Sequence, residues 1–154
     1  MKPYIIGIDP DTVKSGFAIY STEENALVEL RAVKFFDLFE YLKQIKDMIF
    51  LCRIEAGWLN KKSNFHTRYG QSKAAGERIS KNVGSNAETG RKIAEMCEYL
   101  GVEYELVKPI GTKDIDHFIF KKITGWRGKT NQDTRDAGML CFGYKINKHL
   151  KKIE

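Results

Sequence analysis

The chain has 154 residues, of which 42% are hydrophobic and 30% are charged, and its formal net charge is +6. This length and composition predict one domain over residues 1–154 and exclude a largely disordered chain. No apolar run approaches the roughly 18 residues of a membrane-spanning helix, so we expect a cytoplasmic protein, in the host cytoplasm if the source is viral. The positive charge favours a polyanionic partner.

The first part of the chain is predicted to form strands. Residues 4–9 are an apolar run that ends in Asp9, and residues 15–21 are a second apolar run. A third strand is expected over residues 26–35. Because only short polar turns separate these three segments, we expect an antiparallel meander.

A helix and a fourth strand are predicted next. Apolar residues recur at helical spacing over residues 36–46. Residues 48–55 are almost continuously apolar and end in Glu55, as is typical of a strand that is covered on both faces. Residues 57–83 are polar and basic with weak periodicity, and we expect them to form a loop.

The remainder of the chain alternates helix and strand. A helix is predicted over residues 86–100 with Ser85 as its N-cap, and a fifth strand over residues 102–107. Further helices are expected over residues 112–123 and 131–150. This order predicts an α/β fold with a five-stranded mixed sheet, in which strands 1–3 are antiparallel, the later strands are linked through helices, and helices flank the sheet.

Carboxylates stand at the ends of two predicted strands and on the last predicted helix. Asp9 and Glu55 each close an apolar run, where burying a charge is unfavourable unless something compensates it. Asp133 and Asp136 are three residues apart and share one helix face. Carboxylate oxygens bind hard cations such as Mg²⁺, and two such ions can clamp a phosphodiester. The pattern therefore predicts a metal site for phosphoryl chemistry.

These motifs, in this order, resemble those of the RNase H-like superfamily and, within it, of the RuvC-like Holliday junction resolvases. The resemblance covers nearly the whole chain and rests on Gly7-Ile8-Asp9-Pro10, Ser15-Gly16-Phe17-Ala18, Ile54-Glu55 and Asp133-Thr134-Arg135-Asp136-Ala137. The segment that follows Glu55 is longer than in the cellular bacterial resolvases, and Pro-Asp-Thr replaces the more usual Pro-Gly. Both departures indicate a divergent branch, such as a bacteriophage member.

The resemblance implies a metal-dependent endonuclease that resolves four-way DNA junctions by paired phosphodiester hydrolysis. It assigns, as catalytic residues and ligands of two Mg²⁺ ions for which Mn²⁺ can substitute, Asp9, Glu55, Asp133 and Asp136. Lys129 is a further catalytic candidate for contact with the scissile phosphate, although a solvated loop lysine would look the same. Two symmetric cuts need two sites, which implies a homodimer, and residues 86–100 are its expected surface.

The loop predicted over residues 57–83 is a candidate DNA-binding surface. Its cations would meet phosphates and its aromatic rings would stack on unpaired bases. By resemblance, Trp58 stands where an aromatic residue wedges into the junction crossover, and burial of Trp58 in the core is the alternative. The predicted DNA-binding residues are Trp58, Lys61, Lys62, Phe65, Arg68, Tyr69, Lys73, Arg78, Lys81 and, after the fifth predicted strand, Lys108.

Two other functions remain open at this point. A nuclease of the same fold that acts on RNA or on RNA–DNA hybrids would use the same four acids. A non-catalytic nucleic-acid-binding protein of this fold would need only the basic surface.

Asp11 also lies near the proposed metal site, where we expect it to cap the turn after the first strand instead of binding metal.

Overall fold

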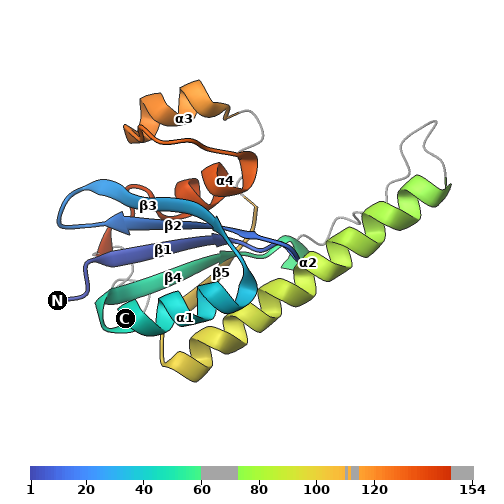
Figure 1. Ribbon diagram of the computed structural model, residues 1–154, viewed down its shortest axis with the longest axis horizontal. Coiled ribbons are helices and arrows are strands. Elements are labelled where there is room, and N and C mark those ends of the chain that lie inside the picture. The colour runs from blue at the N-terminus through green and yellow to red at the C-terminus, as the bar shows by residue number, and fades with distance from the viewer. Residues whose placement is uncertain (60–72, 110, 112–114, 147–154) are drawn as a thin grey trace.

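A five-stranded sheet in the order β3-β2-β1-β4-β5 forms the centre of the molecule (Figure 1). The computed structural model describes residues 1–59, 73–109, 111 and 115–146. The first three strands pair antiparallel, whereas the fourth pairs parallel with β1 and the fifth pairs parallel with the fourth. The strands are β1 (Tyr4–Asp9), β2 (Ser15–Ser21), β3 (Ala26–Val33), β4 (Ile49–Glu55) and β5 (Tyr104–Val107).

Helices cover both faces of this sheet (Figure 1). One face packs against α1 and α2, and the other against α3 and α4. The helices are α1 (Phe35–Ile45), α2 (Lys73–Leu100), α3 (His117–Thr124) and α4 (Gln132–Cys141), with short 3-10 turns η1 (Lys46–Met48) and η2 (Gly57–Leu59). The predicted α/β fold with a mixed sheet flanked by helices is therefore confirmed.

The hydrophobic core follows the two-residue alternation of the strands. On β1, Ile6 and Ile8 face α1 and α2, whereas Ile5 belongs to the cluster of α3 and α4. That second cluster also contains Phe120 from α3 and Ala137 from α4, both with no exposed surface. The same alternation places Gly7 and Asp9 on the α4 face, which decides where the Asp9 carboxylate points.

The loop predicted over residues 57–83 is wrong in its later part, because α2 is helical from Lys73. Ser85 is correspondingly no N-cap: its hydroxyl donates to the carbonyl oxygen of Lys81 within the helix, at 2.9 Å. The hydroxyl of Thr89 does the same to Ser85, at 3.0 Å. Gly76 and the exposed Gly84 weaken the helical signal of this stretch, which explains why its sequence reads as a loop.

The last predicted helix is too long, since α4 ends at Cys141. Phe142 leaves the helical conformation and Gly143 adopts a φ of 72°, a left-handed value that glycine tolerates best. Residues 147–154 lie outside the described residues. Of the helix expected over residues 112–123, residues 112–114 lie outside the described residues. Helix α3 begins at His117, because Asp116 accepts a hydrogen bond from the backbone N–H of Ile119 as the N-cap.

Smaller differences concern where strands meet helices. The third strand ends at Val33 because α1 already begins at Phe35. The fifth strand begins at Tyr104, since Gly101 takes a φ of 71° and Val102 still donates to the carbonyl of Cys97 at the end of α2. Among the described residues, no helix combines the length and the apolar composition that crossing a membrane requires.

Candidate metal centre

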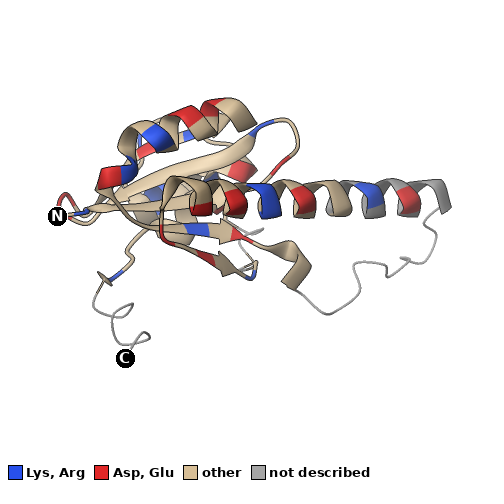
Figure 2. Ribbon diagram, turned by 90° about the horizontal axis from the view of Figure 1, so that it is seen from below, with Lys and Arg blue, Asp and Glu red and all other residues tan. Residues whose placement is uncertain are grey.

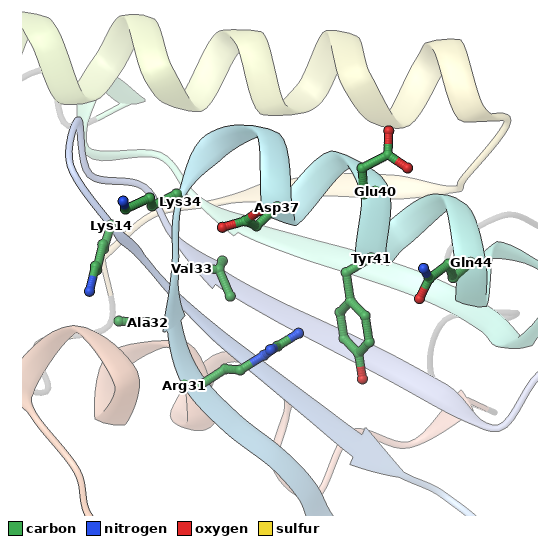
Figure 3. A pocket seen from close by; sticks show the side chains of 9 residues that line it. All are labelled: Lys14, Arg31, Ala32, Val33, Lys34, Asp37, Glu40, Tyr41 and Gln44. Carbon is green, nitrogen blue, oxygen red and sulfur yellow. The ribbon is translucent and has the colours of Figure 1, made fainter.

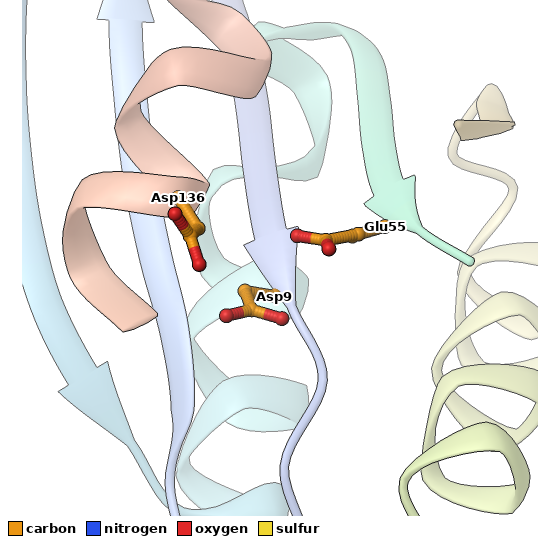
Figure 4. Close-up of side chains that lie close together, drawn as sticks. All are labelled: Asp9, Glu55 and Asp136. Atoms are coloured by element: carbon orange, nitrogen blue, oxygen red, sulfur yellow. The ribbon is translucent and has the colours of Figure 1, made fainter. Parts of the chain in front are cut away.

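Two neighbouring strands end in carboxylates at the same edge of the sheet. β1 ends at Asp9 and β4 ends at Glu55, and the two strands run parallel with Ile8 opposite Ile54. Parallel neighbours bring their carboxyl ends to one edge, so the two acids become neighbours although 46 positions separate them in the sequence. Figure 4 shows the side chains of Asp9 and Glu55 pointing toward a common space.

The N-terminal turns of α4 add further carboxylates to this edge. Asn131 caps the helix by accepting a hydrogen bond from the N–H of Thr134 at 2.9 Å, and the hydroxyl of Thr134 accepts from the N–H of Asn131 at 2.9 Å. This capping box fixes the first turn, which carries Asp133, while Asp136 follows one turn later. Helix α4 packs over β1 and β2 and therefore presents both acids to Asp9.

Asp9, Glu55 and Asp136 form a group that can hold a metal ion (Figure 4). Each offers one carboxylate oxygen, and these oxygens lie within 4.8 Å of one another. Asp133 lies beside the group and shares a hydrogen bond with Asp9. The side-chain amide of Gln132 donates to Asp136 at 2.7 Å, which fixes the orientation of that ligand candidate. The assignment of all four acids as ligands stays a prediction.

The pKa values of these carboxylates are raised because the groups are partly buried and lie close to one another. Burial, together with the negative charges of Glu55, Asp133 and Asp136, raises the pKa of Asp9 to about 9. Burial and the charges of Asp136 and Asp133 raise the pKa of Glu55 to about 7. The pKa of Asp133 is also raised, by burial and then by Asp11 and Asp136. A divalent cation would relieve this repulsion, so the group has the electrostatics of a cation site.

Asp11 has the structural role that its position in the sequence suggests. Its carboxylate accepts hydrogen bonds from the N–H groups of Val13 at 2.9 Å and Lys14 at 3.4 Å. These contacts hold the turn between β1 and β2, directly after Asp9. Asp11 therefore supports the site by shaping the turn, and its charge also bears on Asp133.

Trp58 lies in η2, three residues after Glu55, and packs against α2. A methyl group added at Gly90 of α2 would lie 2.5 Å from the Trp58 ring and 3.2 Å from Pro10, so all three residues meet tightly. The guanidinium of Arg91 lies 5.2 Å from the centre of the same ring. The structure thus places Trp58 between α2 and the turn after Asp9, while its predicted contact with DNA stays a prediction.

The other predicted nucleic-acid-binding residues are distributed unevenly. Lys108 after β5, Lys129 before α4 and Lys81 on α2 are exposed, but none belongs to the carboxylate group. Lys73 and Arg78 lie within α2. Outside the described residues lie Lys61, Lys62, Phe65, Arg68 and Tyr69. The DNA-contacting roles of all these residues stay predictions.

A hollow of about 410 Å³ lies elsewhere, between β3 and α1 (Figure 3). Its lining combines Lys14, Arg31 and Lys34 with Asp37 and Glu40. Arg31 is engaged within the fold, since its guanidinium lies 4.4 Å from the centre of the Tyr41 ring and 3.5 Å from a carboxylate oxygen of Glu29. The mixed charge of this hollow gives it no selectivity for phosphate, so the acidic edge is the better candidate site.

Sequence reasoning missed the residues that hold α4 in place. Arg53 of β4 donates to the carbonyl oxygen of Leu140 and forms an ion pair with Glu105, with a nitrogen–oxygen distance of 2.6 Å. Gly7 and Gly16 lie directly under the helix backbone. Both glycines belong to the motifs that carry the family resemblance, but their sequence context alone does not indicate that a helix packs on them.

Two solved structures of RuvC from Thermus thermophilus are similar to this chain. RuvC in complex with a Holliday junction substrate matches with a TM-score of 0.62 and 13% sequence identity, over 96% of each chain. A second Thermus thermophilus RuvC structure matches with a TM-score of 0.57 and 12% identity, also over 96% of each chain. No protein-family model and no curated protein matches the sequence. The chain therefore has the RNase H-like fold in the form found in RuvC.

Proposed function

We propose that this protein is a divalent-cation-dependent endonuclease that resolves four-way DNA junctions. The observation that carries the proposal is the convergence of Asp9, Glu55 and Asp136, with oxygens within 4.8 Å, in a chain with the fold of RuvC. One of the similar structures is a RuvC complex with a Holliday junction substrate. The formal net charge of +6 also suits a DNA partner.

The donors of the site fit magnesium. Asp9, Glu55 and Asp136 offer carboxylate oxygens, the ligand type that Mg²⁺ prefers, and the raised pKa values of Asp9 and Glu55 reflect a repulsion that a cation would cancel. Mn²⁺ accepts the same ligands, and we propose two ions in each site. Bound ions would lower the pKa of a coordinated water and neutralise charge on the phosphodiester.

The residues of this chain divide the remaining work. Asp9 is central, since it neighbours Glu55 and Asp136 and shares a hydrogen bond with Asp133. We assign Asp133 as the fourth ligand, because it lies in the first turn of α4 beside Asp9. Lys129 is exposed two residues before the N-cap Asn131, and we propose that its ammonium group contacts the scissile phosphate.

The two cuts that resolve a junction call for two copies of this site. A C₂ homodimer would match the two-fold symmetry of a junction and supply both sites. We propose that exposed Lys81 and Lys108 contribute to the DNA-binding surface around them. Discrimination would come from the shape and charge of the junction, with sequence preference as a second layer.

The test is cleavage of a synthetic immobile four-way junction, with linear duplex and an RNA–DNA hybrid of the same sequence as competing substrates. The proposal predicts paired nicks at symmetric positions on the junction with Mg²⁺ or Mn²⁺, and none with EDTA. Cleavage of the hybrid alone would support the acidic residues as catalytic but would show that the substrate is an RNA–DNA hybrid and not a four-way junction. Junction binding without cleavage, over a panel of junction sequences, would contradict the enzymatic proposal.

A further inference from the structure

Helix α4 lies against the sheet at a point where the strand below it has no side chain. A Cβ atom built on Gly16 of β2 would lie 2.0 Å from the carbonyl oxygen and 2.5 Å from the carbonyl carbon of Asp133. The backbone nitrogen of Thr134 is 3.1 Å away from the same position. All three atoms belong to the helix backbone, so no side-chain rotation can make room for a methyl group.

This close contact lies directly beside the proposed ligands. Gly16 is the partner of Asp9 in the antiparallel register of β1 and β2. The residue that rests on Gly16 is Asp133, which shares a hydrogen bond with Asp9. The helix that carries two of the proposed ligands therefore contacts β2 at this glycine, directly opposite the proposed ligand Asp9 on β1.

Gly7 supports the same helix one turn further along. A Cβ atom on Gly7 would lie 2.0 Å from the carbonyl oxygen of Ala137 and 3.3 Å from the sulfur of Cys141. Ala137 directly follows Asp136. Two glycines on adjacent strands thus set the height of α4 above the sheet along the whole length that carries the acids.

We infer that Gly16 is a positioning residue of the cation site, because it sets the distance between Asp9 and the carboxylates of α4 and thereby favours a small ion. The inference rests on the cation site of the proposed function. An ordinary van der Waals contact begins at 3.4 Å, so a methyl group on Gly16 would displace the helix backbone by roughly 1 Å or more. Mg²⁺ requires ligands at about 2.0–2.1 Å in near-ideal octahedral geometry, whereas Ca²⁺ accepts about 2.3–2.6 Å and irregular geometry.

The test compares Mg²⁺ and Ca²⁺ binding to the DNA-free protein, from the rise in melting temperature and from titration calorimetry. We expect Gly16→Ala to weaken Mg²⁺ binding at least tenfold and Ca²⁺ binding by a smaller factor. Ile19→Val is the matched control, because it removes a core methyl group from the face opposite α4. It should lower the melting temperature and leave the Mg²⁺ affinity unchanged.

Unchanged Mg²⁺ affinity in a folded Gly16→Ala variant would overturn the inference, as would an equal loss of Mg²⁺ and Ca²⁺ affinity. If Gly16→Ala does not fold, Gly7→Ala displaces the helix beside Asp136 and carries the same expectation. Mg²⁺ binding that is lost in Asp9→Asn would show that the ion occupies the acidic edge. If the wild-type protein binds Mg²⁺ there but cuts no junction, the proposed function fails, while the effect of Gly16→Ala on Mg²⁺ affinity still tests the role of Gly16.

Discussion

Helices α4 and α2 both border the acidic edge, yet they are attached to the sheet in opposite ways. Helix α4 is bound along its whole length, with Gly16 and Gly7 beneath it, the Asn131 cap at its start and Arg53 on the carbonyl of Leu140 near its end. Helix α2 packs through its C-terminal half, where Ile93 and Cys97 are fully buried, and its other half projects beyond the sheet (Figure 1).

The difference separates a helix that carries proposed ligands from a helix that extends beyond the sheet. Metal ligands must be held within about 0.5 Å, which suits a helix pressed on backbone atoms at two glycines. The projecting half of α2 has exposed charges at Glu77 and Lys81, and acidic and basic residues are both distributed along the helix (Figure 2).

The largest expected effect comes from removing the central carboxylate. Asp9→Asn should reduce junction cleavage more than about 100-fold, since even residues that only support metal ligands change activity by about 10- to 100-fold. The DNA-free variant should also melt at a higher temperature at pH 8 than the wild type, because burial and neighbouring acids disfavour the ionised form of Asp9. Cleavage assays and thermal melts measure the two effects.

Asp47→Asn is the control for that variant. Asp47 is exposed in η1, just before β4 begins at Ile49, and therefore lies at the opposite end of that strand from Glu55. Its substitution should leave cleavage within about twofold of the wild type, because substitutions on the exposed surface change stability by less than about 0.5 kcal/mol. Equal cleavage by Asp9→Asn and Asp47→Asn would show that the acidic edge is not catalytic.

Cation binding should strengthen as the pH rises. The folded protein raises the pKa of Asp9 from 3.8 to about 9 and that of Glu55 from 4.5 to about 7. The folded state therefore holds protons that the unfolded chain releases, so the cation-free protein loses stability between about pH 4 and pH 9. Mg²⁺ must displace these protons, and its affinity should rise by up to about tenfold per pH unit for each proton displaced.

Melting temperatures with EDTA and with Mg²⁺, measured from pH 5.5 to pH 9, check this prediction. The gain caused by Mg²⁺ should grow across the series in the wild type and much less in Asp9→Asn. A gain that is the same at every pH would mean that the bound cation meets no protonated carboxylate, which contradicts the electrostatics of the site.

A methyl group on Gly90 should disturb α2 and spare α4. It would lie 2.5 Å from the ring of Trp58, and overpacking of this kind destabilises by about 1–3 kcal/mol. We expect a lower melting temperature and weaker junction binding for Gly90→Ala, with Mg²⁺ affinity close to that of the wild type. Loss of Mg²⁺ affinity in this variant would show that the two helices are not independent.

Gly84→Ala is a matched control on the same helix. Gly84 is exposed, and no atom lies within 4 Å of the added carbon. Alanine is favoured over glycine within a helix by about 1 kcal/mol, so this variant should melt at a slightly higher temperature. A fall in melting temperature for Gly90→Ala and a rise for Gly84→Ala would show that the contact with Trp58 attaches α2 to the rest of the fold.

The smallest expected effect concerns the cap of α4. Asn131→Ala removes the side chain that accepts from the N–H of Thr134, which should lower stability by about 1 kcal/mol. The glycine contacts would remain, so Mg²⁺ affinity should fall less than in Gly16→Ala. A larger loss of Mg²⁺ affinity from the cap variant would mean that the cap, and not the contact with the sheet, positions Asp133.

The acidic edge was predictable because it depends on where strands end. The apolar runs that close at Asp9 and Glu55 mark two strands directly, and parallel pairing brings their ends together. The spacing of Asp133 and Asp136 places both on one helix face. Local pattern and strand pairing place Asp9 and Glu55 at one edge, and the resemblance to the RuvC-like resolvases is what adds the two acids of the last helix.

The attachments of the two helices were not predictable in the same way. Trp58 meets Gly90 and Gly16 meets Asp133 across long stretches of sequence, and both contacts depend on how closely the helices pack on other parts of the fold. The N-terminal part of α2 reads as a loop because its glycines and polar residues hide the helical period. Tertiary packing decides these features, and a single sequence carries no direct record of it.

The most direct test of the central claim is to locate Mn²⁺ in crystals of the protein by anomalous diffraction, in parallel for wild type and Asp9→Asn. We expect an anomalous peak between Asp9, Glu55 and Asp136 on the α4 face of the sheet in the wild type, and a much weaker peak or none in Asp9→Asn. A peak at another place in the wild type, or an equally strong peak in Asp9→Asn, would contradict it.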